Sequence, residues 1–453
     1  MAAGLGTRMR SRLPKLLHPL CGRPMLGYTL DAAREATGQQ PLVVYSPATA
    51  RIRDVFADAA DFALQDEPLG TGDAVRAALA ALLTVHPGAT EILVLNGDVP
   101  RLQAELLVAL LEQRRGVGAP VALITVAAAE PGSLGRVVRS VEGSIERIVE
   151  AKDATDDELE IGEINAGLYA FDLAWLRRRL HDIVPSPATG ELYLTDLVRY
   201  ARADGHEVTS LVVEDDGRLL GINDRLQLAE AEGELRSELI TRHLLAGVTM
   251  EDPSTVYIDA TVELASDVTL EPHVVLRGRT RIGQGTVIGS GSRIVDTVIG
   301  RDCRISASVL EGSEVDDEVQ VGPFSHLRPG SRVGAGAEIG NYAEIKNSRL
   351  GPGVKQHHMS YLGDAEVGAS TNIGAGTITA NYDGQRKQRT TIGERAFLGV
   401  DTMLVAPVEV GDDAKTGAGA VVTHDVPPGT LAVGVPARIR EPRQRPPDEA
   451  ESR

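Results

Sequence analysis

The chain has 453 residues, with 46 Lys and Arg against 64 Asp and Glu, and so a formal net charge of −18. That length predicts two or three domains, and the negative charge argues against nucleic acid or an anionic membrane as the main partner. Cys21 and Cys303 lie too far apart in sequence for a disulfide framework, and the apolar run over 121–129 is too short to span a bilayer. We therefore expect a cytoplasmic protein without membrane insertion.

The N-terminal half shows the pattern of an α/β domain. Apolar runs at 42–45, 92–95 and 121–124 predict buried parallel strands, and helical stretches at 73–84 and 103–113 lie between them. Alternating strands and helices predict a doubly wound, Rossmann-like sheet, whose ligands bind at the carboxyl ends of its strands. We expect this domain to cover residues 1–223 and a long helix over 224–246 to follow it.

The C-terminal half is a hexapeptide array. Aliphatic residues recur at every sixth position as Ile258, Leu264, Leu270, Leu276, Ile282, Ile288 and Ile294. A strand alternates with period two and a helix with 3.6, so period six fits neither alone. It fits a coil of three short faces, each with one inward aliphatic side chain, and glycines serving the turns. Seven consecutive matches disfavour the alternative, an ordinary β-sandwich with a chance period.

The pattern resembles the left-handed parallel β-helix of hexapeptide-repeat acyltransferases. We expect this all-β domain to cover residues 247–440, with two loops that interrupt the coil around 350–366 and 375–391. The tail over 441–453 is rich in Pro, Arg and acidic residues, which predicts disorder.

Residues near the N-terminus indicate phosphate chemistry. The glycine-rich segment 4–8 ends in Arg8, and Pro14-Lys15 follows it. Such a turn brings backbone N–H groups to phosphate oxygens, and Arg8 and Lys15 add charge. Asp98 follows the strand at 92–95, where a carboxylate is placed to hold Mg²⁺ between phosphates; alternatively it caps a turn. The longer string AAGxGTRM with its later PK resembles the nucleotidyltransferases that make nucleoside-diphosphate sugars.

Further motifs in both halves extend this resemblance over residues 1 to about 437. The motif in the coil is the segment 357–364. Those in the N-terminal half are Gln65 together with the segment 69–72, and the segments 96–100, 135–136, 150–153, 163–167 and 221–223. Together they resemble the bacterial bifunctional N-acetylglucosamine-1-phosphate uridyltransferase/glucosamine-1-phosphate acetyltransferases. The resemblance implies a homotrimeric enzyme that acetylates glucosamine 1-phosphate with acetyl-CoA. It would then transfer uridylyl from UTP to give UDP-N-acetylglucosamine, a precursor of peptidoglycan, with release of pyrophosphate.

The resemblance also implies roles for individual residues of the first domain. Asp98 and Asn223 would ligate Mg²⁺, and Arg8 and Lys15 would neutralise phosphate charge. Contacts to UTP or the product would come from Met1, Ala2, Ala3, Gly4, Lys15, Gln65, Gly70, Thr71, Asn96, Gly97 and Asp98. Contacts to the amino sugar would come from Gly135, Glu150 and Asn165.

In the coil, the resemblance makes His358 the base that acetyl transfer to an amine requires. Arg328 and Lys346 would bind the sugar phosphate, and Tyr361 and Asn372 the sugar. The acetyl-CoA site would be lined by Ala375, Asn381, Tyr382, Val400 and Ala418, with Lys387 near the phosphates of acetyl-CoA. A zinc site at His357 and His358 is disfavoured, because adjacent residues of a strand point to opposite faces.

Three features depart from the family pattern. Val400 stands where a serine is frequent, and 433–436 lacks the arginine that some relatives use on acetyl-CoA; both departures predict weaker acetyl transfer. In the family, a hydrophobic strand precedes the Ala-Ala-Gly turn. In this sequence, only Met1 stands before that turn. We expect the native start to lie upstream, rather than this half to be destabilised, and native protein that begins at Met1 or Ala2 would contradict this.

Two other functions are compatible with parts of the pattern. One is a single-activity sugar-phosphate nucleotidyltransferase with a regulatory β-helix, and acetyl-CoA turnover distinguishes it. The other is a non-catalytic assembly protein of the same folds, which Mg²⁺-dependent consumption of UTP would exclude.

Overall fold

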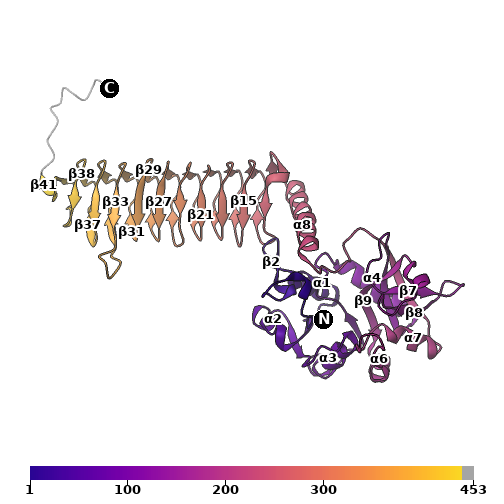
Figure 1. Ribbon diagram of the computed structural model, residues 1–453. Coiled ribbons are helices and arrows are strands. Elements are labelled where there is room, and N and C mark those ends of the chain that lie inside the picture. The colour runs from indigo at the N-terminus through magenta and orange to yellow at the C-terminus, as the bar shows by residue number, and fades with distance from the viewer. Residues whose placement is uncertain (441–453) are drawn as a thin grey trace. The chain divides into compact units, whose positions relative to one another are not determined.

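The computed structural model describes residues 1–440, so the predicted disordered tail at 441–453 lies outside the described residues. The chain divides into two compact units, residues 1–235 and the part from Arg236 onward (Figure 1). The helix predicted at 224–246 is α8 (Arg225–Leu245), and the division falls within it. Within residues 1–440, none of the helices combines the length and apolarity needed to cross a bilayer.

A mixed sheet forms the centre of the N-terminal unit. Its middle strands are β6 (Val121–Ala127) and β9 (Glu163–Asp172), and β10 (Val208–Glu214) lies parallel to β6. Strand β9 runs antiparallel to β6 and to β5 (Glu91–Val94), so the sheet is mixed. The strands predicted at 92–95 and 121–124 are β5 and β6, and they run parallel to each other. The antiparallel strands β7 (Arg136–Arg139) and β8 (Ile145–Val149) precede β9 in the chain and extend the same sheet, with β7 paired to β9.

Helices cover both faces of this sheet, as the alternating pattern predicts. Val121 and Leu123 pack toward α3, α6 and α7, whereas the alternate residues Ala122 and Ile124 pack toward α1 and α4. The helices are α1 (Met25–Thr37), α2 (Arg51–Val55), α3 (Thr71–Val85), α4 (Ala104–Val117), α5 (Asp156–Leu159), α6 (Leu173–Arg179) and α7 (Asp196–Ala203). Helices α3 and α4 confirm the helices predicted at 73–84 and 103–113.

Two short parallel strands lie apart from the main sheet. Strand β3 (Leu42–Tyr45), which the apolar run at 42–45 predicts, pairs with β4 (Asp61–Leu64). Within residues 1–440, no strand pairs with the other edge of β3, and β5 likewise pairs with β9 alone. A short antiparallel pair, β1 (Pro19–Leu20) and β2 (Arg23–Pro24), follows the N-terminal loop.

The second unit is the predicted left-handed parallel β-helix (Figure 1). Its described strands form three sheets of 12, 10 and 9 strands, stacked coil upon coil. The sheets begin at β11 (Thr249–Met250), β12 (Tyr257–Ile258) and β13 (Glu263–Leu264), and end at β41 (Arg438–Arg440), β39 (Val421–Val422) and β37 (Val408–Val410). The inward aliphatic positions are confirmed: Ile258, Leu270 and Ile288 are buried in one continuous core, with Leu264 packed against it.

The glycines that follow these aliphatic residues allow coils to approach one another. A Cβ on Gly283 would lie 2.6 Å from the carbonyl carbon of Gly300 on the next coil, and a Cβ on Gly340 would meet the backbone of His357. Neither glycine has the left-handed backbone that only glycine adopts readily. Close approach, rather than positive φ, therefore excludes side chains at these positions.

The first predicted interruption, at 350–366, was wrong, because the coil continues through it. Strands β29 (Lys355–Gln356), β30 (Ser360–Gly363) and β31 (Ala365–Val367) stack in register with their neighbours. The buried position is taken by Gln356, whose Nε2 donates to Ser360 Oγ at 2.8 Å, so no aliphatic residue marks it. The second interruption is real but shorter. It lies between β33 (Ile378–Ala380) and β34 (Thr390–Ile392), where a bridge joins Tyr382 to Lys387.

Candidate active sites

Three predicted residues from distant parts of the chain meet in the N-terminal unit. Lys15 begins a 3₁₀ turn, Asp98 follows β5, and Asn223 precedes α8. Lys15 Nζ donates to Asp98 Oδ2 at 2.5 Å and to Asn223 Oδ1 at 3.2 Å. One ammonium group thus bridges the two side chains expected to ligate Mg²⁺.

The oxygens of this cluster fit a hard cation. Asp98 Oδ1 is buried and has no hydrogen-bond partner among the described residues, which is costly for a carboxylate oxygen unless a ligand completes it. Mg²⁺ binds carboxylate and amide oxygens, and Asp98 and Asn223 supply one of each. The donor set therefore suits the predicted ion.

The predicted base-reading segment is held by residues that the sequence pattern did not reveal. Gln65 is buried, and its Nε2 donates to Asp73 Oδ2 at 2.6 Å. Gly70, with φ 118°, precedes α3, and a Cβ there would lie within 2.6 Å of the backbone of Leu192. Thr71 Oγ1 accepts from the backbone N–H of Leu194 at 2.9 Å. The loop is thus fixed from one side by α3 and from the other by residues 192–194.

The glycine-rich N-terminal loop combines a buried start with an exposed turn. Ala2 and Ala3 are buried, whereas Gly4 is exposed with open space around its Cα. Arg8 is exposed on the 3₁₀ turn Thr7–Met9, and within residues 1–440 no ion pair involves it. Its charge is therefore available to an anion.

The three residues expected to contact the sugar lie together on and beside β7 to β9. The backbone N–H of Asn165 donates to the carbonyl of Gly135 at 2.9 Å, and a Cβ on Gly135 would lie 3.5 Å from Glu150 Oε2. Glu150 Oε1 accepts from Thr195 Oγ1 at 3.1 Å. Asn165 Nδ2 donates to the hydroxyl of Tyr169 at 2.5 Å. Asn96 lies against Gly167, since a Cβ there would overlap its Nδ2.

Glu150 is electrostatically unfavourable in this setting. Burial raises the pKa of its carboxyl, the hydrogen bond from Thr195 opposes that shift, and the nearby acids Asp153, Glu191 and Asp196 raise the pKa further. A largely buried carboxyl with a raised pKa and several acids around it is typical of a binding site.

We expect Glu150→Gln to stabilise the N-terminal unit near pH 7. The folded state holds the Glu150 proton more tightly than the unfolded chain, so its ionisation costs stability as pH rises from the unfolded pKa through the folded pKa. Gln keeps an acceptor for Thr195 and does not ionise. The gain should be about 2–4 °C in Tm for each kcal/mol recovered. Scanning calorimetry at pH 7.5 and at pH 4 should show the gain only at the higher pH.

In the β-helix, basic residues follow one another on successive coils. Leu327 of β24 (His326–Leu327) pairs with Ile345 of β27 (Ala343–Lys346), and Lys346 pairs with Gly363 of β30. Arg328, Lys346 and Gly363 therefore share a register position. Arg328 Nη1 donates to Glu344 Oε1 at 2.8 Å. The Lys387 ammonium lowers the pKa of Lys346, and Arg328 adds to this effect. Three cations held this close form a site for an anion.

The loop after β33 lies close to Tyr361. Asn381 Nδ2 donates to Asp364 Oδ2 at 2.6 Å, and a Cβ on Gly363 would lie 2.7 Å from that Nδ2 and closer still to the Tyr361 hydroxyl. Gly363 and Asp364 thus place Tyr361 and Asn381 next to each other. Sequence reasoning assigned no role to Gly363, because glycine is frequent throughout the coil.

We expect Gly363→Ala to lower acetyl transfer by roughly 10- to 100-fold while the β-helix still folds. The methyl group would displace only the tips of Tyr361 and Asn381, and a misplacement of about 1 Å can cost 100-fold in rate. Steady-state acetyl transfer should fall, whereas circular dichroism should be unchanged. Pyrophosphate release by the other unit of the same chain is the internal control.

A second row carries His358 and most of the predicted acetyl-CoA residues. Tyr361 pairs with Ile378, Ile378 with Met403, and Met403 with Val421. The residues three positions before these four paired residues therefore also share a register position. They are, in the same order, His358, Ala375, Val400 and Ala418. Backbone N–H groups of Asp401 and Gly419 donate to the carbonyls of Ala375 and Val400 at 2.6 and 2.8 Å. The row runs along one corner of the coil, with His358 exposed at its start.

The expectation that His357 and His358 occupy opposite faces of a strand was wrong, since both lie in the turn after β29. His357 Nε2 lies 2.7 Å from Glu338 Oε2. The two rings meet edge to face at 6.4 Å between centroids.

Two predicted residues lie apart from both rows. Asn372 begins β32 (Asn372–Ile373), in the 12-stranded sheet of the described residues, whereas Tyr361 and Lys346 belong to the 10-stranded sheet. Tyr382 is 61% exposed on the inserted loop, and its hydroxyl donates to Gly384 O at 2.7 Å. Asn372 therefore lies on a different sheet from the two rows, and Tyr382 lies on the inserted loop opposite Lys387.

Known protein families match parts of both units. Residues 1–156 match the MobA-like NTP transferase domain, and residues 279–310 and 389–424 match the hexapeptide repeat of succinyl-transferase. The bifunctional protein GlmU of Mycobacterium tuberculosis is 43% identical over 440 residues, covering 96% of this chain and 88% of that protein. The chain belongs to the GlmU family.

Other GlmU proteins are similar over the same span. The GlmU proteins of Kineococcus radiotolerans and Trichlorobacter lovleyi are each 45% identical to this chain. Each alignment covers 96% of this chain, together with 89% of the Kineococcus protein and 94% of the Trichlorobacter protein. As a GlmU protein, the chain is a bifunctional transferase with a nucleotidyltransferase domain and a hexapeptide acetyltransferase domain. The nucleotidyltransferase match includes Lys15 and Asp98, and the two hexapeptide matches lie on either side of His358.

Proposed function

We propose that this GlmU chain makes UDP-N-acetylglucosamine in two steps. It acetylates glucosamine 1-phosphate with acetyl-CoA and then joins the product to the uridylyl group of UTP. The observation that carries the proposal is the meeting of Lys15, Asp98 and Asn223, because only the fold brings these residues together, and they form a cation and oxygen cluster suited to polyphosphate.

In uridylyl transfer, a phosphate oxygen of the sugar attacks the α-phosphorus of UTP, and the bond to pyrophosphate breaks. Such a reaction requires alignment and charge neutralisation. Lys15 and Arg8 contribute positive charge on the phosphates, and Gln65 and the loop at Gly70 hold the base. Glu150 and Asn165 hold the sugar. Asp98 and Asn223 would hold Mg²⁺, which offsets phosphate charge when bound.

In acetyl transfer, the amine of the sugar attacks the thioester carbon, and the bond to sulfur breaks. His358 takes the proton that the nitrogen loses, and the CoA thiolate leaves. Arg328 and Lys346 hold the sugar phosphate, with Tyr361 beside its ring. Acetyl-CoA lies along the row of Ala375, Val400 and Ala418, with its phosphates near Lys387.

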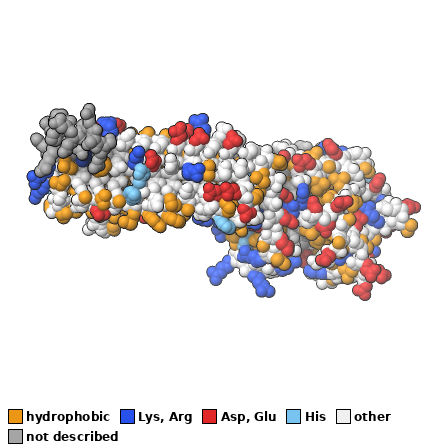
Figure 2. All heavy atoms as spheres, turned by 90° about the horizontal axis from the view of Figure 1, so that it is seen from above, with side chains coloured by type: hydrophobic (Ala, Val, Ile, Leu, Met, Phe, Trp, Pro, Cys, Tyr) orange, Lys and Arg blue, Asp and Glu red, His pale blue; other side chains and the backbone are white. Residues whose placement is uncertain are grey.

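We also propose a homotrimer in the cytoplasm. Asn372 lies apart from Lys346 and Tyr361, so a neighbouring copy would complete the acetyl site. Hydrophobic side chains gather along one edge of the β-helix (Figure 2). Phe324, Tyr342 and Met359 are 58%, 61% and 65% exposed, and they occupy one register position on successive coils. Exposed apolar rows of this kind are typical of subunit interfaces.

Two assays on one preparation test the proposal. Pyrophosphate should be released from UTP and N-acetylglucosamine 1-phosphate with Mg²⁺, and CoA thiol from acetyl-CoA and glucosamine 1-phosphate. Loss of only one activity would reduce the proposal to a single transferase, and loss of both would refute it. Light scattering should give the mass of three chains.

A further inference from the structure

Gln356 places a polar side chain in the apolar core of the β-helix. It lies in β29, and none of its side chain is exposed. Its register partner on the preceding coil is Ile339. On the next coil, Ile373 holds the equivalent inward position, because Lys355 pairs with Asn372. Both isoleucines are buried in the continuous core, so Gln356 interrupts a column of aliphatic side chains.

The amide of Gln356 is only half satisfied in this position. Its Oε1 is buried without a hydrogen-bond partner among residues 1–440, which disfavours the folded state. Its Nε2 donates to Ser360 Oγ at 2.8 Å. A leucine here would continue the column and would bury no unpaired oxygen. The contribution that distinguishes Gln356 from an aliphatic residue is therefore its bond to Ser360.

The bond to Ser360 continues to the backbone of His358. Ser360 Oγ donates to the His358 carbonyl at 2.9 Å. Because an amide nitrogen can only donate, Ser360 Oγ accepts from Gln356 and keeps its own hydrogen for that carbonyl. Ser360 is itself buried, so solvent competes little for either bond. Gln356 thus directs the Ser360 hydroxyl at His358.

The carbonyl of His358 is held differently from the two carbonyls beside it. The carbonyls just before and just after it accept from the backbone N–H groups of Asn341 and Gly376, at 3.2 and 2.7 Å. These two bonds join the turn to the preceding and the next coil. The His358 carbonyl accepts instead from the Ser360 side chain. The backbone position of His358 therefore depends on side chains inside the coil.

We propose that Gln356 is a positioning residue for His358 in acetyl transfer and acts through the Ser360 hydroxyl. The inference rests on the proposed function, in which His358 takes the proton of the attacking amine. No hydrogen bond from residues 1–440 reaches the His358 ring, which meets the His357 ring edge to face, so its place follows from its backbone. A general base must lie within hydrogen-bond reach of the proton that it takes, and supporting hydrogen bonds maintain such a geometry.

Gln356→Leu should change stability and rate in opposite directions. The variant removes the unpaired oxygen, so the Tm of the β-helix should rise by about 2–4 °C. It also releases the Ser360 hydroxyl, so the kcat of acetyl transfer should fall about tenfold, since a misplacement of about 1 Å can cost roughly 100-fold. The KM for glucosamine 1-phosphate should stay within about twofold, because Arg328 and Lys346 are unchanged. A normal kcat in this variant would overturn the proposal.

Substitution of Ser360 tests the connection to His358. Ser360→Ala leaves the Gln356 nitrogen without an acceptor and the His358 carbonyl without a donor, so both Tm and kcat should fall. Combining it with Gln356→Leu makes both partners apolar, so the Tm should recover. The kcat should remain as low as in Ser360→Ala, because the hydroxyl is still missing. A rate that recovers together with the Tm would show a merely structural role and would overturn the proposal.

Ile373→Val is the matched control, because it changes the packing of the same column and no hydrogen bond. Its Tm should fall slightly, and its kcat should stay within about twofold of the parent rate. A tenfold loss of kcat in this control would overturn the proposal, since packing alone would then limit the rate. A parent chain that releases no CoA thiol would refute the proposed function instead, so the two failures are distinguishable.

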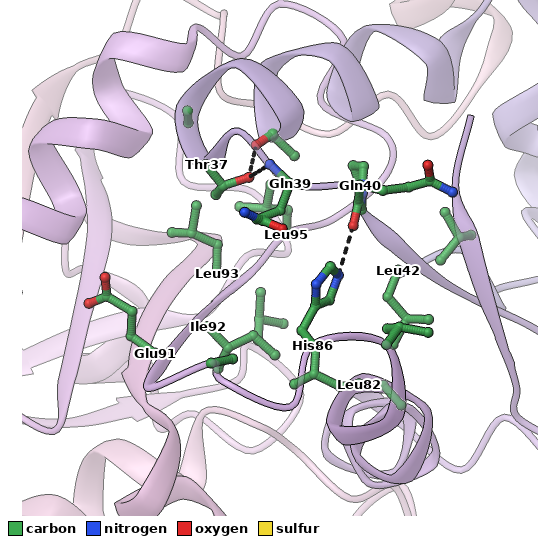
Figure 3. Close-up of a pocket in the computed structure, with 18 of the residues that line it drawn as sticks. Thr37, Gln39, Gln40, Leu42, Leu82, His86, Glu91, Ile92, Leu93 and Leu95 are labelled. Atoms are coloured by element: carbon green, nitrogen blue, oxygen red, sulfur yellow. Dashed lines mark hydrogen bonds between the residues drawn. The ribbon is translucent and has the colours of Figure 1, made fainter. Parts of the chain in front are cut away.

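The N-terminal unit determines how the Tm should be measured. Between β3 and β5 it has a groove of about 670 Å³ with apolar walls, where Leu42, Ile92 and Leu93 lie (Figure 3). An apolar dye can bind such a groove before the protein unfolds, so scanning calorimetry is the better method. Trp175 is the only tryptophan of the chain, and its fluorescence should report an unchanged N-terminal unit in every variant.

Discussion

Replacing Asp98 by Asn is expected to lower the kcat of pyrophosphate release by roughly 100- to 1,000-fold, the range for losing one preorganised electrostatic group. Asp98 Oδ2 holds the Lys15 ammonium at 2.5 Å, and Oδ1 is buried without a partner among the described residues. Asn keeps the shape but loses the charge, so both the position of Lys15 and the affinity for Mg²⁺ should suffer. Rates should be measured across Mg²⁺ concentrations, where the variant should need more ion to reach its maximum.

The two activities of the chain provide the control for this variant. Acetyl transfer by Asp98→Asn should equal that of the parent chain, because the β-helix forms its own core. Asp58→Asn removes an exposed carboxylate from the same unit and should leave both rates within about twofold. A normal rate of pyrophosphate release in Asp98→Asn would remove this carboxylate from the proposed mechanism.

The coil could be predicted from the sequence because each of its positions is set by local rules. One aliphatic residue per six marks the core, and a following glycine marks close contact between coils. The prediction was wrong at 350–366 because Gln356 is buried there through its bond to Ser360. The six-residue period is recognised by its apolar residues. A polar side chain that is buried in the coil and hydrogen-bonded there does not match that pattern.

The sheet of the N-terminal unit was harder to predict, because strand direction is not a local property. Residues 163–167 were interpreted as a binding motif, yet they begin β9, which runs antiparallel to its neighbours. Nothing in that segment encodes its direction, which is apparent only from its pairing with β5, β6 and β7.

In the candidate sites too, individual residues could be predicted from the sequence, whereas their contacts with one another could not. The resemblance supplied Lys15, Asp98 and Asn223, whereas only the structure shows that one ammonium group joins the other two side chains. Likewise, the acids that surround Glu150 include Glu191 and Asp196, which are some 40 residues away in the chain. No spacing rule connects them with Glu150, so its raised pKa could not be predicted from sequence.

Replacing His358 by Gln is expected to lower acetyl transfer by roughly 100- to 10,000-fold, the range for losing a general base. His358 is exposed in the turn after β29 and begins the row that continues with Ala375 and Val400. Gln can donate and accept hydrogen bonds but cannot take the proton of the attacking amine. The KM for glucosamine 1-phosphate should change little, because Arg328 and Lys346 remain, so the loss should lie in kcat.

The adjacent histidine makes a stringent control for this experiment. His357→Gln changes the same residue type one position earlier, but His357 lies against Glu338, with 2.7 Å between Nε2 and Oε2. Its acetyl transfer should stay within about twofold of the parent rate. Added imidazole should restore part of the activity of His358→Gln, since a free base can replace the missing one. Equal losses in the two variants would show that the turn, rather than the proton transfer at His358, limits the reaction.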